Sequence, residues 1–170
     1  MFYFHIIVVI IALLLCYKLG DWRNWQKYYS SILFFMMGDF IYLVLFRKTM
    51  LWMYNTDILN HTLVNLLIIF TVYPATILLF IPHFPKGILK RSGYILLWVA
   101  LFSATEYISY RLGCFSYHNG WNIGWSIIFS SIMFPLQYIH YKKPLSAWCF
   151  ALIKLLFFIA LFQVDIMSLI

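Results

Sequence analysis

Six long apolar stretches occupy nearly all of this 170-residue chain. A bilayer core is about 30 Å thick, and a helix that crosses it needs about 20 mostly apolar residues. The apolar fraction is 65% and the charged fraction is 10%, whereas an ordinary soluble domain is about 45–50% apolar. The sequence therefore predicts an all-α polytopic transmembrane bundle of about six helices. The expected spans cover residues 2–17, 28–46, 61–81, 92–112, 122–139 and 145–164.

The connectors between these spans are too short for a soluble domain, so residues 1–170 are expected to form a single integral membrane domain. A transmembrane β-barrel would alternate polar and apolar residues, whereas residues 6–15 are apolar on both faces. Residues 1–15 lack the basic start and the small-residue cleavage site of a secretion signal, so we expect a retained first helix. Segment 49–60 is too polar to span and is expected to lie flat, or to dip, at the membrane surface. Five helices are the alternative, if the first helix or this segment lies differently.

Basic residues are distributed unevenly among the connectors. The net charge is +7, and eight Lys and Arg residues fall on one side of the predicted membrane against three on the other. Because basic residues gather on the cytoplasmic side, both termini are expected outside. The basic connectors then lie against anionic headgroups, so membrane lipids are the expected partners and nucleic acid is not. The cytoplasmic set is Lys18, Arg23, Lys27, Lys86, Lys90, Arg91, Lys142 and Lys143, and the outer set is Arg47, Lys48 and Arg111.

Two carboxylates, Asp39 and Glu106, lie inside the apolar stretches. Charged groups in a bilayer are costly, and they generally face the bundle interior or a wet cavity. At 1.5 Å per residue, both lie about 10 Å below the outer ends of their helices. In the same outer half, His61 and Asn65 are one turn apart on one helix face. The sequence therefore predicts an outer polar pocket. Its candidate ligand-binding residues are Asp39, Asp57, His61, Asn65, Glu106, Tyr110, Tyr117, His118, Asn119 and Asn122.

These candidates also have structural interpretations. Asp39 and Glu106 are alternatively buried, hydrogen-bonded struts, and His61 is alternatively a structural hydrogen-bonding group. Glu106 shares a helix face with Ser103 and Tyr110. The polar tract 117–122 opens the fifth span, either as a helix cap or as an active loop.

Three further features bear on partners. Arg111 is expected either to extend to the membrane interface or to pair with Asp57. Lys154, inside the sixth span, is expected to pack its stem while its amine seeks a partner or the interface. Gly120 and Gly124 form a G-x-x-x-G spacing that permits close helix approach, and with it a possible homo-oligomer.

No catalytic or metal motif stands out. A metal site from His61, His118 and a carboxylate would lack any local ligand motif such as H-E-x-x-H, so no metal is expected. The sequence also has no nucleophile elbow, phosphate loop or kinase-like motif. The sequence therefore identifies no catalytic residues and no cofactor, and it does not decide whether the protein is an enzyme. If there is catalysis, His61 or Glu106 is the expected acid or base.

Four strings together resemble a family of small polytopic membrane proteins of Bacillus-like spore-forming bacteria, a family without an established activity. They are GDWRNW at 20–25, FPK at 84–86, NGWN at 119–122 and HYKKPL at 140–145. The resemblance covers most of the chain. It implies a multi-pass protein of the bacterial plasma membrane with a compact multi-helix fold, and it implies no activity.

Three functional hypotheses follow from the sequence. The first is a polar pocket in the outer leaflet that binds a lipid or another amphiphile, with Glu106 and Asp39 as its floor. The second is a structural or accessory subunit of a larger membrane complex. The third is a small proton- or ion-coupled carrier, which would need polar groups on both sides of the midplane; the inner half of this chain has few, so this hypothesis is the least favoured.

Overall fold

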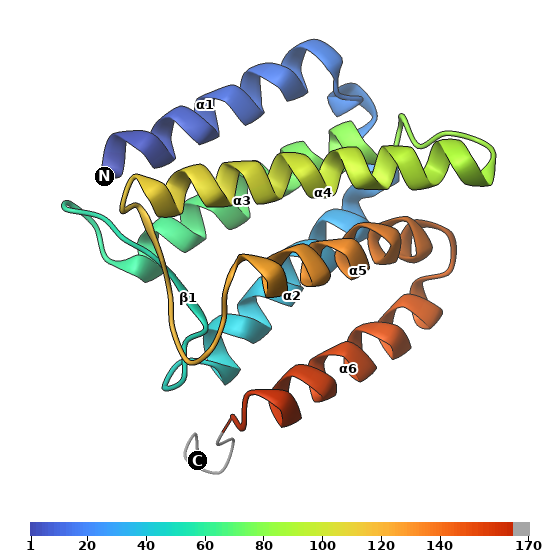
Figure 1. Ribbon diagram of the computed structural model, residues 1–170. Helices are drawn as coiled ribbons and strands as arrows, with labels where there is room; N and C mark the ends of the chain where they lie inside the picture. Colours follow the sequence, from blue (N-terminus) through green and yellow to red (C-terminus); the bar gives the residue numbers. More distant parts are fainter. Residues whose placement is uncertain (165–170) are drawn as a thin grey trace.

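The computed structural model describes residues 1–164, in which six helices run alternately back and forth (Figure 1). Each of the six expected spans is a helix with ends within a few residues of expectation, so the predicted helical transmembrane bundle is confirmed. A short 3-10 helix, η1 (Trp22–Tyr28), leads into α2. The long helices are α1 (Phe2–Leu19), α2 (Tyr29–Leu45), α3 (His61–Phe80), α4 (Ile88–Arg111), α5 (Ile123–Lys142) and α6 (Pro144–Leu161).

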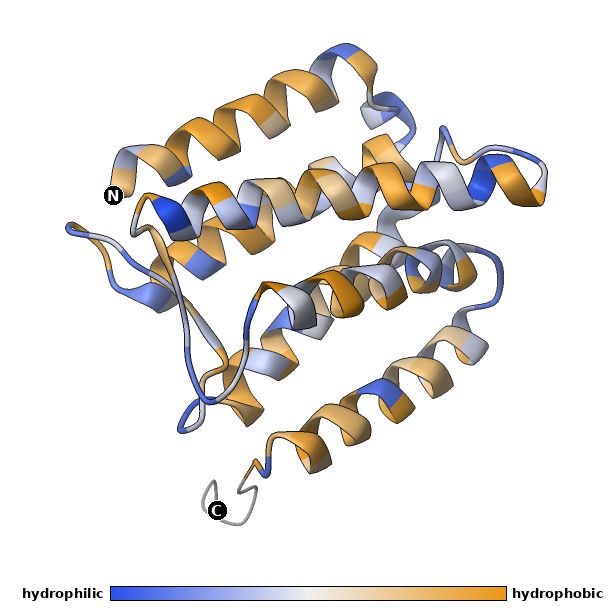
Figure 2. Cartoon of the chain, in the orientation of Figure 1, coloured by the Kyte–Doolittle hydropathy of each residue, from blue (hydrophilic) through white to orange (hydrophobic). Residues whose placement is uncertain are grey.

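Four helical stretches are both long enough and apolar enough to cross a membrane: α1, Trp22–Leu45, α3 and α6. Helices α4 and α5 carry more polar side chains and do not meet that measure on their own. They nevertheless run the length of the bundle, because the segment between them returns to the end where α2 finishes and α3 begins. Hydrophobic residues dominate the helices, and hydrophilic residues gather in the connectors (Figure 2).

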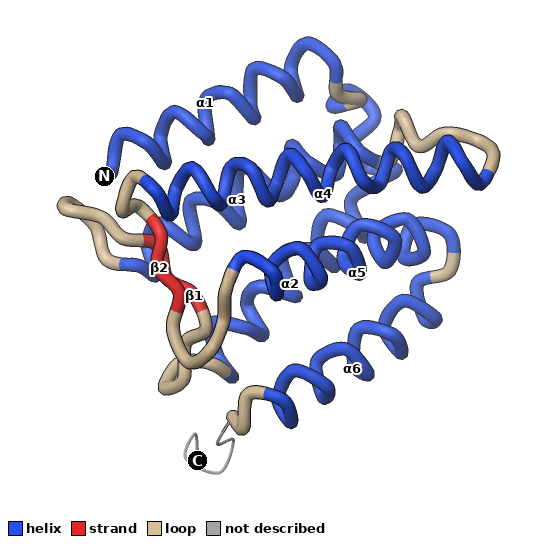
Figure 3. Tube along the Cα trace, in the orientation of Figure 1, coloured by secondary structure: helices blue, strands red, loops and turns tan. Residues whose placement is uncertain are grey.

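A two-stranded antiparallel sheet closes one end of the bundle (Figure 3). Strand β1 (Trp52–Tyr54) pairs with β2 (Phe115–Tyr117), with Trp52 opposite Tyr117 and Tyr54 opposite Phe115. The sequence did not predict these strands; it predicted only that segment 49–60 lies flat, or dips, at the membrane surface. Three-residue strands are too short to show a period-2 pattern. Their pairing joins two connectors that are far apart in the sequence.

We call this end of the bundle the sheet end and the opposite end the basic end. The N-terminus and the end of α6 both lie at the sheet end (Figure 1). The connector before α2, the connector between α3 and α4, and the connector between α5 and α6 all lie at the basic end. The eight basic residues of the predicted cytoplasmic set therefore gather there, while Arg47, Lys48 and Arg111 lie at the sheet end.

The helices pack unevenly. Helix α1 packs against α3, and α2 packs against both α3 and α5. Helix α5 also contacts α4 and α6. Helices α1, α4 and α6 are therefore each packed mainly against one other helix. This uneven packing leaves space beside α1 and beside α6.

Asn122 caps α5, as one of the two interpretations of tract 117–122 predicts. Its Oδ1 accepts hydrogen bonds from the backbone N–H groups of Gly124 at 2.9 Å and Trp125 at 3.4 Å. Gly120 precedes the helix and has a φ of +81°, a left-handed conformation that favours glycine. Gly120 and Gly124 therefore do not share a helix face, and the predicted close-approach surface is wrong.

Asp21 fixes η1 at the basic end. Its carboxylate accepts hydrogen bonds from Asn24 Nδ2 at 2.7 Å and from the Tyr28 hydroxyl at 2.8 Å. Its backbone N–H donates to the carbonyl oxygen of Leu78 in α3, at 3.0 Å. The hydrogen bonds from Asn24 and Tyr28 lower the pKa of Asp21.

Asp21→Asn is expected to lower the unfolding midpoint in mild detergent at pH 7, because the neutral amide is a weaker acceptor than the carboxylate. A carboxyl group whose pKa is lowered in the folded state stabilises the fold above its unfolded pKa, and this contribution disappears as pH falls through the folded pKa. The difference in unfolding midpoint between wild type and Asp21→Asn should therefore narrow below pH 4. Thermal unfolding of both proteins at a series of pH values from 3 to 7 measures this difference. A difference that stays constant over this range would contradict the assignment.

Candidate functional site

Two cavities lie side by side in the bundle. The Glu106 cavity, of about 380 Å³, is lined mainly by α1, α3, α4 and α5, with a few residues from α2, the two strands and the connector before α5. The Asp39 cavity, of about 190 Å³, is lined mainly by α2, α5 and α6. The larger volume falls in the usual range for small-molecule sites. The two cavities share a wall made of Phe35, Trp52, Tyr73, Trp121, Phe129 and Met133.

This arrangement divides the pocket that the sequence predicts. Asp39 and Glu106 were expected to form one floor, but each lines its own cavity. Tyr54 lies within electrostatic reach of both carboxylates. Burial raises the pKa of Tyr54, and the charges of Asp39 and Glu106 raise it further. The two candidate acids therefore lie on either side of a shared group of tyrosine and other aromatic side chains.

Glu106 is held in place from the sheet. Its Oε1 accepts a hydrogen bond from the Tyr117 hydroxyl at 2.7 Å, and the Tyr117 ring contacts that of Tyr110 with centroids 5.0 Å apart. Burial, followed by the hydrogen bond to Glu106, raises the pKa of Tyr117. The structure thus brings together three predicted site residues. The bond depends on the pairing of β2 with β1, which no helical pattern reveals.

The lining of the Glu106 cavity changes along its length. On α1 it extends from Phe4 to Leu15, a length of about 16 Å at 1.5 Å per residue. Ser130 lies part of the way down, and Thr76, four residues before the basic end of α3, adds one hydroxyl group to the mainly apolar part of the lining. The side chains at the sheet end include His5, Tyr54, Glu106, Ser109 and Ser126, and those at the basic end include Leu15, Leu79 and Trp98. The cavity is therefore polar at one end and apolar at the other.

Asp39 is a buried carboxyl group in the middle of α2. Its side chain is 8% exposed, and Oδ2 has no hydrogen-bond partner. Asn65 and Tyr73, both on α3, lie beside the carboxyl group. Asn65 is fully buried, and neither of its amide atoms has a partner. Buried polar atoms without partners are rare in native proteins, so Asp39 and Asn65 belong to a buried polar cluster whose hydrogen bonding is incomplete.

His61 has a structural contact instead. Its Nδ1 accepts a hydrogen bond from the backbone N–H of Tyr54 at 3.0 Å, which joins β1 to the start of α3. Its Nε2 is buried without a partner. His61 and Asn65 share a buried face, as predicted, but neither lines the Glu106 cavity or the Asp39 cavity. The structure therefore favours the structural interpretation of His61.

The other predicted residues fasten the sheet end. Asp57 Oδ1 accepts from the Phe2 N–H at 3.0 Å and lies 3.7 Å from the Met1 ammonium group. Asp57 does not pair with Arg111, whose Nη1 donates to the Tyr107 hydroxyl. His118 Nε2 hydrogen-bonds with the Ser116 hydroxyl at 3.0 Å. Asn119 Nδ2 donates to the Met50 carbonyl at 2.8 Å, and Asn122 is the α5 cap described above.

The candidate ligand-binding residues predicted from the sequence did not include three polar residues that line the Asp39 cavity or its shared wall: Lys154, Tyr73 and Gln137. A signal for Lys154 was present in the sequence, because Lys154 and Asp39 lie at nearly equal distances from the sheet ends of their helices. Tyr73 and Gln137 carried no comparable signal. They are ordinary polar side chains in apolar helices until packing places them at a cavity.

The described part of the chain contains no group of three or more His, Cys, Asp or Glu side chains that could hold a metal ion. His61 and His118 make separate contacts, with Tyr54 and Ser116 respectively. The two cavities can therefore bind a ligand through hydrogen bonds, charge and a largely apolar lining.

No family model, curated protein or solved structure matches this chain. The resemblance to membrane proteins of spore-forming bacteria therefore stays a prediction.

Proposed function

We propose that this protein is a multi-pass protein of the bacterial plasma membrane that binds a lipid or another amphiphile in the Glu106 cavity. The polar group of the ligand lies near Glu106, at the sheet end, and its apolar chain lies along α1 and α4. By the distribution of basic residues, the sheet end faces outward. The site then opens in the outer leaflet.

The observation that carries this proposal is the change of lining along the Glu106 cavity. Carboxylate, tyrosine, histidine and serine side chains at one end suit a headgroup, and leucine and tryptophan at the other suit an acyl or isoprenoid chain. Helix α1 packs mainly against α3, so the side of the cavity between α1 and α4 lies toward the membrane. A ligand already dissolved in the bilayer can reach it sideways.

The test is native mass spectrometry of the protein extracted with its own lipids. Wild type is expected to carry a discrete lipid mass. Hydrogen bonds to a charged group contribute about 1.5–3 kcal/mol, so Glu106→Gln should weaken retention about tenfold or more. A wild type without bound lipid, or undiminished binding in a folded Glu106→Gln variant, would contradict the proposal. A tightly bound polypeptide in place of lipid would favour the accessory-subunit hypothesis.

A pair of α1 variants tests the apolar part of the cavity. Ala12 lines the cavity, whereas the neighbouring Ile10 is 50% exposed on the outer face. Ala12→Phe fills space that the chain of the ligand needs and should lower lipid retention, whereas Ile10→Phe should not. If both variants retain lipid equally and their unfolding midpoints are unchanged, the Glu106 cavity is not the binding site.

A further inference from the structure

We propose that the Asp39 cavity is a second binding site, for an amphiphile whose headgroup carries both a protonated amine and a phosphate or carboxylate. The two charged side chains that line this cavity are Asp39 on α2 and Lys154 on α6. They face a common space from separate helices. The site is separate from the Glu106 cavity and uses different charged groups.

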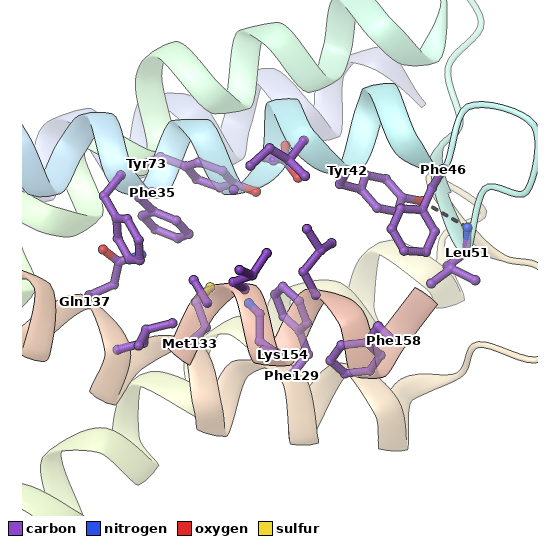
Figure 4. A pocket seen from close by; sticks show the side chains of 18 of the residues that line it. Phe35, Tyr42, Phe46, Leu51, Tyr73, Phe129, Met133, Gln137, Lys154 and Phe158 are labelled. Atoms are coloured by element: carbon purple, nitrogen blue, oxygen red, sulfur yellow. Dashed lines mark hydrogen bonds between the residues drawn. The ribbon is translucent and has the colours of Figure 1, made fainter. Parts of the chain in front are cut away.

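Lys154 supplies the positive charge. Its side chain extends from α6 toward the space between Tyr73 and Phe129 (Figure 4). The ammonium nitrogen lies 4.0 Å from the centre of the Phe129 ring, a cation–π contact. Within residues 1–164, Lys154 forms no ion pair. An ammonium group in apolar surroundings without an anion is unfavourable, so Lys154 is available to an anionic ligand group.

Asp39 supplies the negative charge at a matching depth. It lies about 9 Å from the sheet end of α2, and Lys154 about 10 Å from the sheet end of α6, at 1.5 Å per residue. The two side chains do not form an ion pair with each other in the described structure. The Oδ2 atom of Asp39, buried and without a partner, is an acceptor for a protonated amine. Matching depth across one cavity allows a single headgroup to reach both charges.

Gln137 adds a third polar group. It is 3% exposed, lines the same cavity from α5, and its Oε1 has no partner (Figure 4). Gln137 lies eight residues after Phe129 on α5, about 12 Å nearer the basic end at 1.5 Å per residue, so this oxygen is an acceptor at the end of the cavity away from Lys154. The rest of the lining is largely apolar, and the cavity volume of about 190 Å³ is several times the ~30 Å³ of a water molecule. The cavity therefore has room for a headgroup and few polar groups other than these to bind it.

The approach to the cavity favours a lipid over a water-soluble zwitterion. At the sheet end, Leu51, Trp121 and Phe158 are buried and close the cavity. On the flank between α2 and α6, Gly38 and Leu152 line it and are exposed. A Cβ added at Gly38 would meet nothing within 4 Å, so the space beside it is open. The ligand therefore enters from the bilayer.

The two charges also select among lipids. An anionic lipid such as phosphatidylglycerol would pair with Lys154 but would leave Asp39 buried without a counter-charge. Phosphatidylethanolamine carries a phosphate for Lys154 and an ammonium group for Asp39. We therefore expect about tenfold preferential retention of phosphatidylethanolamine over phosphatidylglycerol.

The experiment titrates delipidated full-length protein in mild detergent with each of these two lipids and measures bound lipid by native mass spectrometry. Lys154→Met keeps the unbranched stem and removes the charge, and it should abolish the preference. Lys142→Met, at the exposed basic end, is the matched control and should retain it. Glu106→Gln should also retain the preference, because Glu106 lines the other cavity. Loss of lipid from the Glu106 cavity in this variant can therefore be told apart from loss of lipid from the Asp39 cavity. Equal binding of the two lipids by wild type, or an unchanged preference in Lys154→Met, would overturn the proposal.

Two further variants test the role of the Asp39 carboxylate and the entry of the ligand past Gly38. Asp39→Asn should raise phosphatidylglycerol binding relative to phosphatidylethanolamine. Gly38→Leu leaves both charges in place and blocks the flank, so it should reduce binding of phosphatidylethanolamine even if Asp39→Asn does not fold. O-phosphoethanolamine at millimolar concentration should not displace the lipid. Its displacement of the lipid, or full binding by Gly38→Leu, would overturn entry from the bilayer.

Discussion

Tyr42→Phe is expected to lower the free energy of unfolding by about 3–5 kcal/mol, because each buried polar group left without a partner costs about 1–3 kcal/mol. The Tyr42 hydroxyl donates to the Trp52 carbonyl at 2.9 Å and accepts the backbone N–H groups of Leu51 and Trp52, both at 3.0 Å. Tyr42 is 6% exposed and Leu51 is 1% exposed. Removing one oxygen atom therefore leaves three backbone groups without this partner.

The substitution isolates the hydroxyl, because phenylalanine keeps the ring. The Tyr42 ring stacks on that of Trp52 with centroids 3.8 Å apart, and this contact survives. Tyr29→Phe, on the same helix at a position 50% exposed, is the matched control and should change stability little. Equilibrium unfolding in mild detergent measures both variants. A loss below about 1 kcal/mol in Tyr42→Phe, typical of a single surface substitution, would show that α2 does not hold the connector before β1 in this way.

Phe80→Ala is expected to destabilise the protein by about 2–4 kcal/mol. Large-to-small core substitutions lose transfer free energy and leave a cavity; in a bilayer the transfer part is small, because lipid is as apolar as the core. Phe80 is fully buried at the basic end of α3. Its ring contacts those of Tyr94, Trp98 and Phe134 with centroids 5.2–5.7 Å apart. The loss of these contacts, which join α3, α4 and α5, is the main source of the effect.

Phe70→Ala provides the comparison for Phe80→Ala. Phe70 lies on the same helix but is 60% exposed, on a face that lipid can cover. Its substitution should change the unfolding midpoint much less than that of Phe80→Ala, measured in the same detergent. Similar losses in the two variants would mean that general helix propensity or detergent contact, and not the aromatic core, sets the stability.

The helices were predictable because the bilayer restricts the backbone conformations that an apolar segment can adopt. A stretch of about 20 apolar residues has one stable form in lipid, a helix that pairs all its backbone groups internally. The expected 61–81 and observed His61–Phe80 agree almost residue for residue. The strands were not predictable, since Trp52–Tyr54 and Phe115–Tyr117 are short and their pairing depends on helices in between.

The candidate site was predictable only in part. Intramembrane charge identified Asp39 and Glu106, and the structure places both at cavities. The sequence could not show that a wall of aromatic side chains separates them, because that wall is assembled from β1 and several helices. His61 illustrates the converse. Its position on the same helix face as Asn65 suggested a ligand, but the partner of its Nδ1 is a backbone N–H of β1.

By itself, the amino-acid sequence determined the class of the protein, its six helices, their alternating direction and the segregation of basic residues to one end. Each of these follows from local composition, since spans and connectors are set by hydropathy and charge along the chain. Tertiary structure alone decided which polar side chains meet. The Tyr117–Glu106 hydrogen bond and the Asp39–Lys154 cavity join residues from different elements. Such juxtapositions depend on helix rotation and side-chain packing, which an apolar stretch surrounded by lipid leaves unspecified.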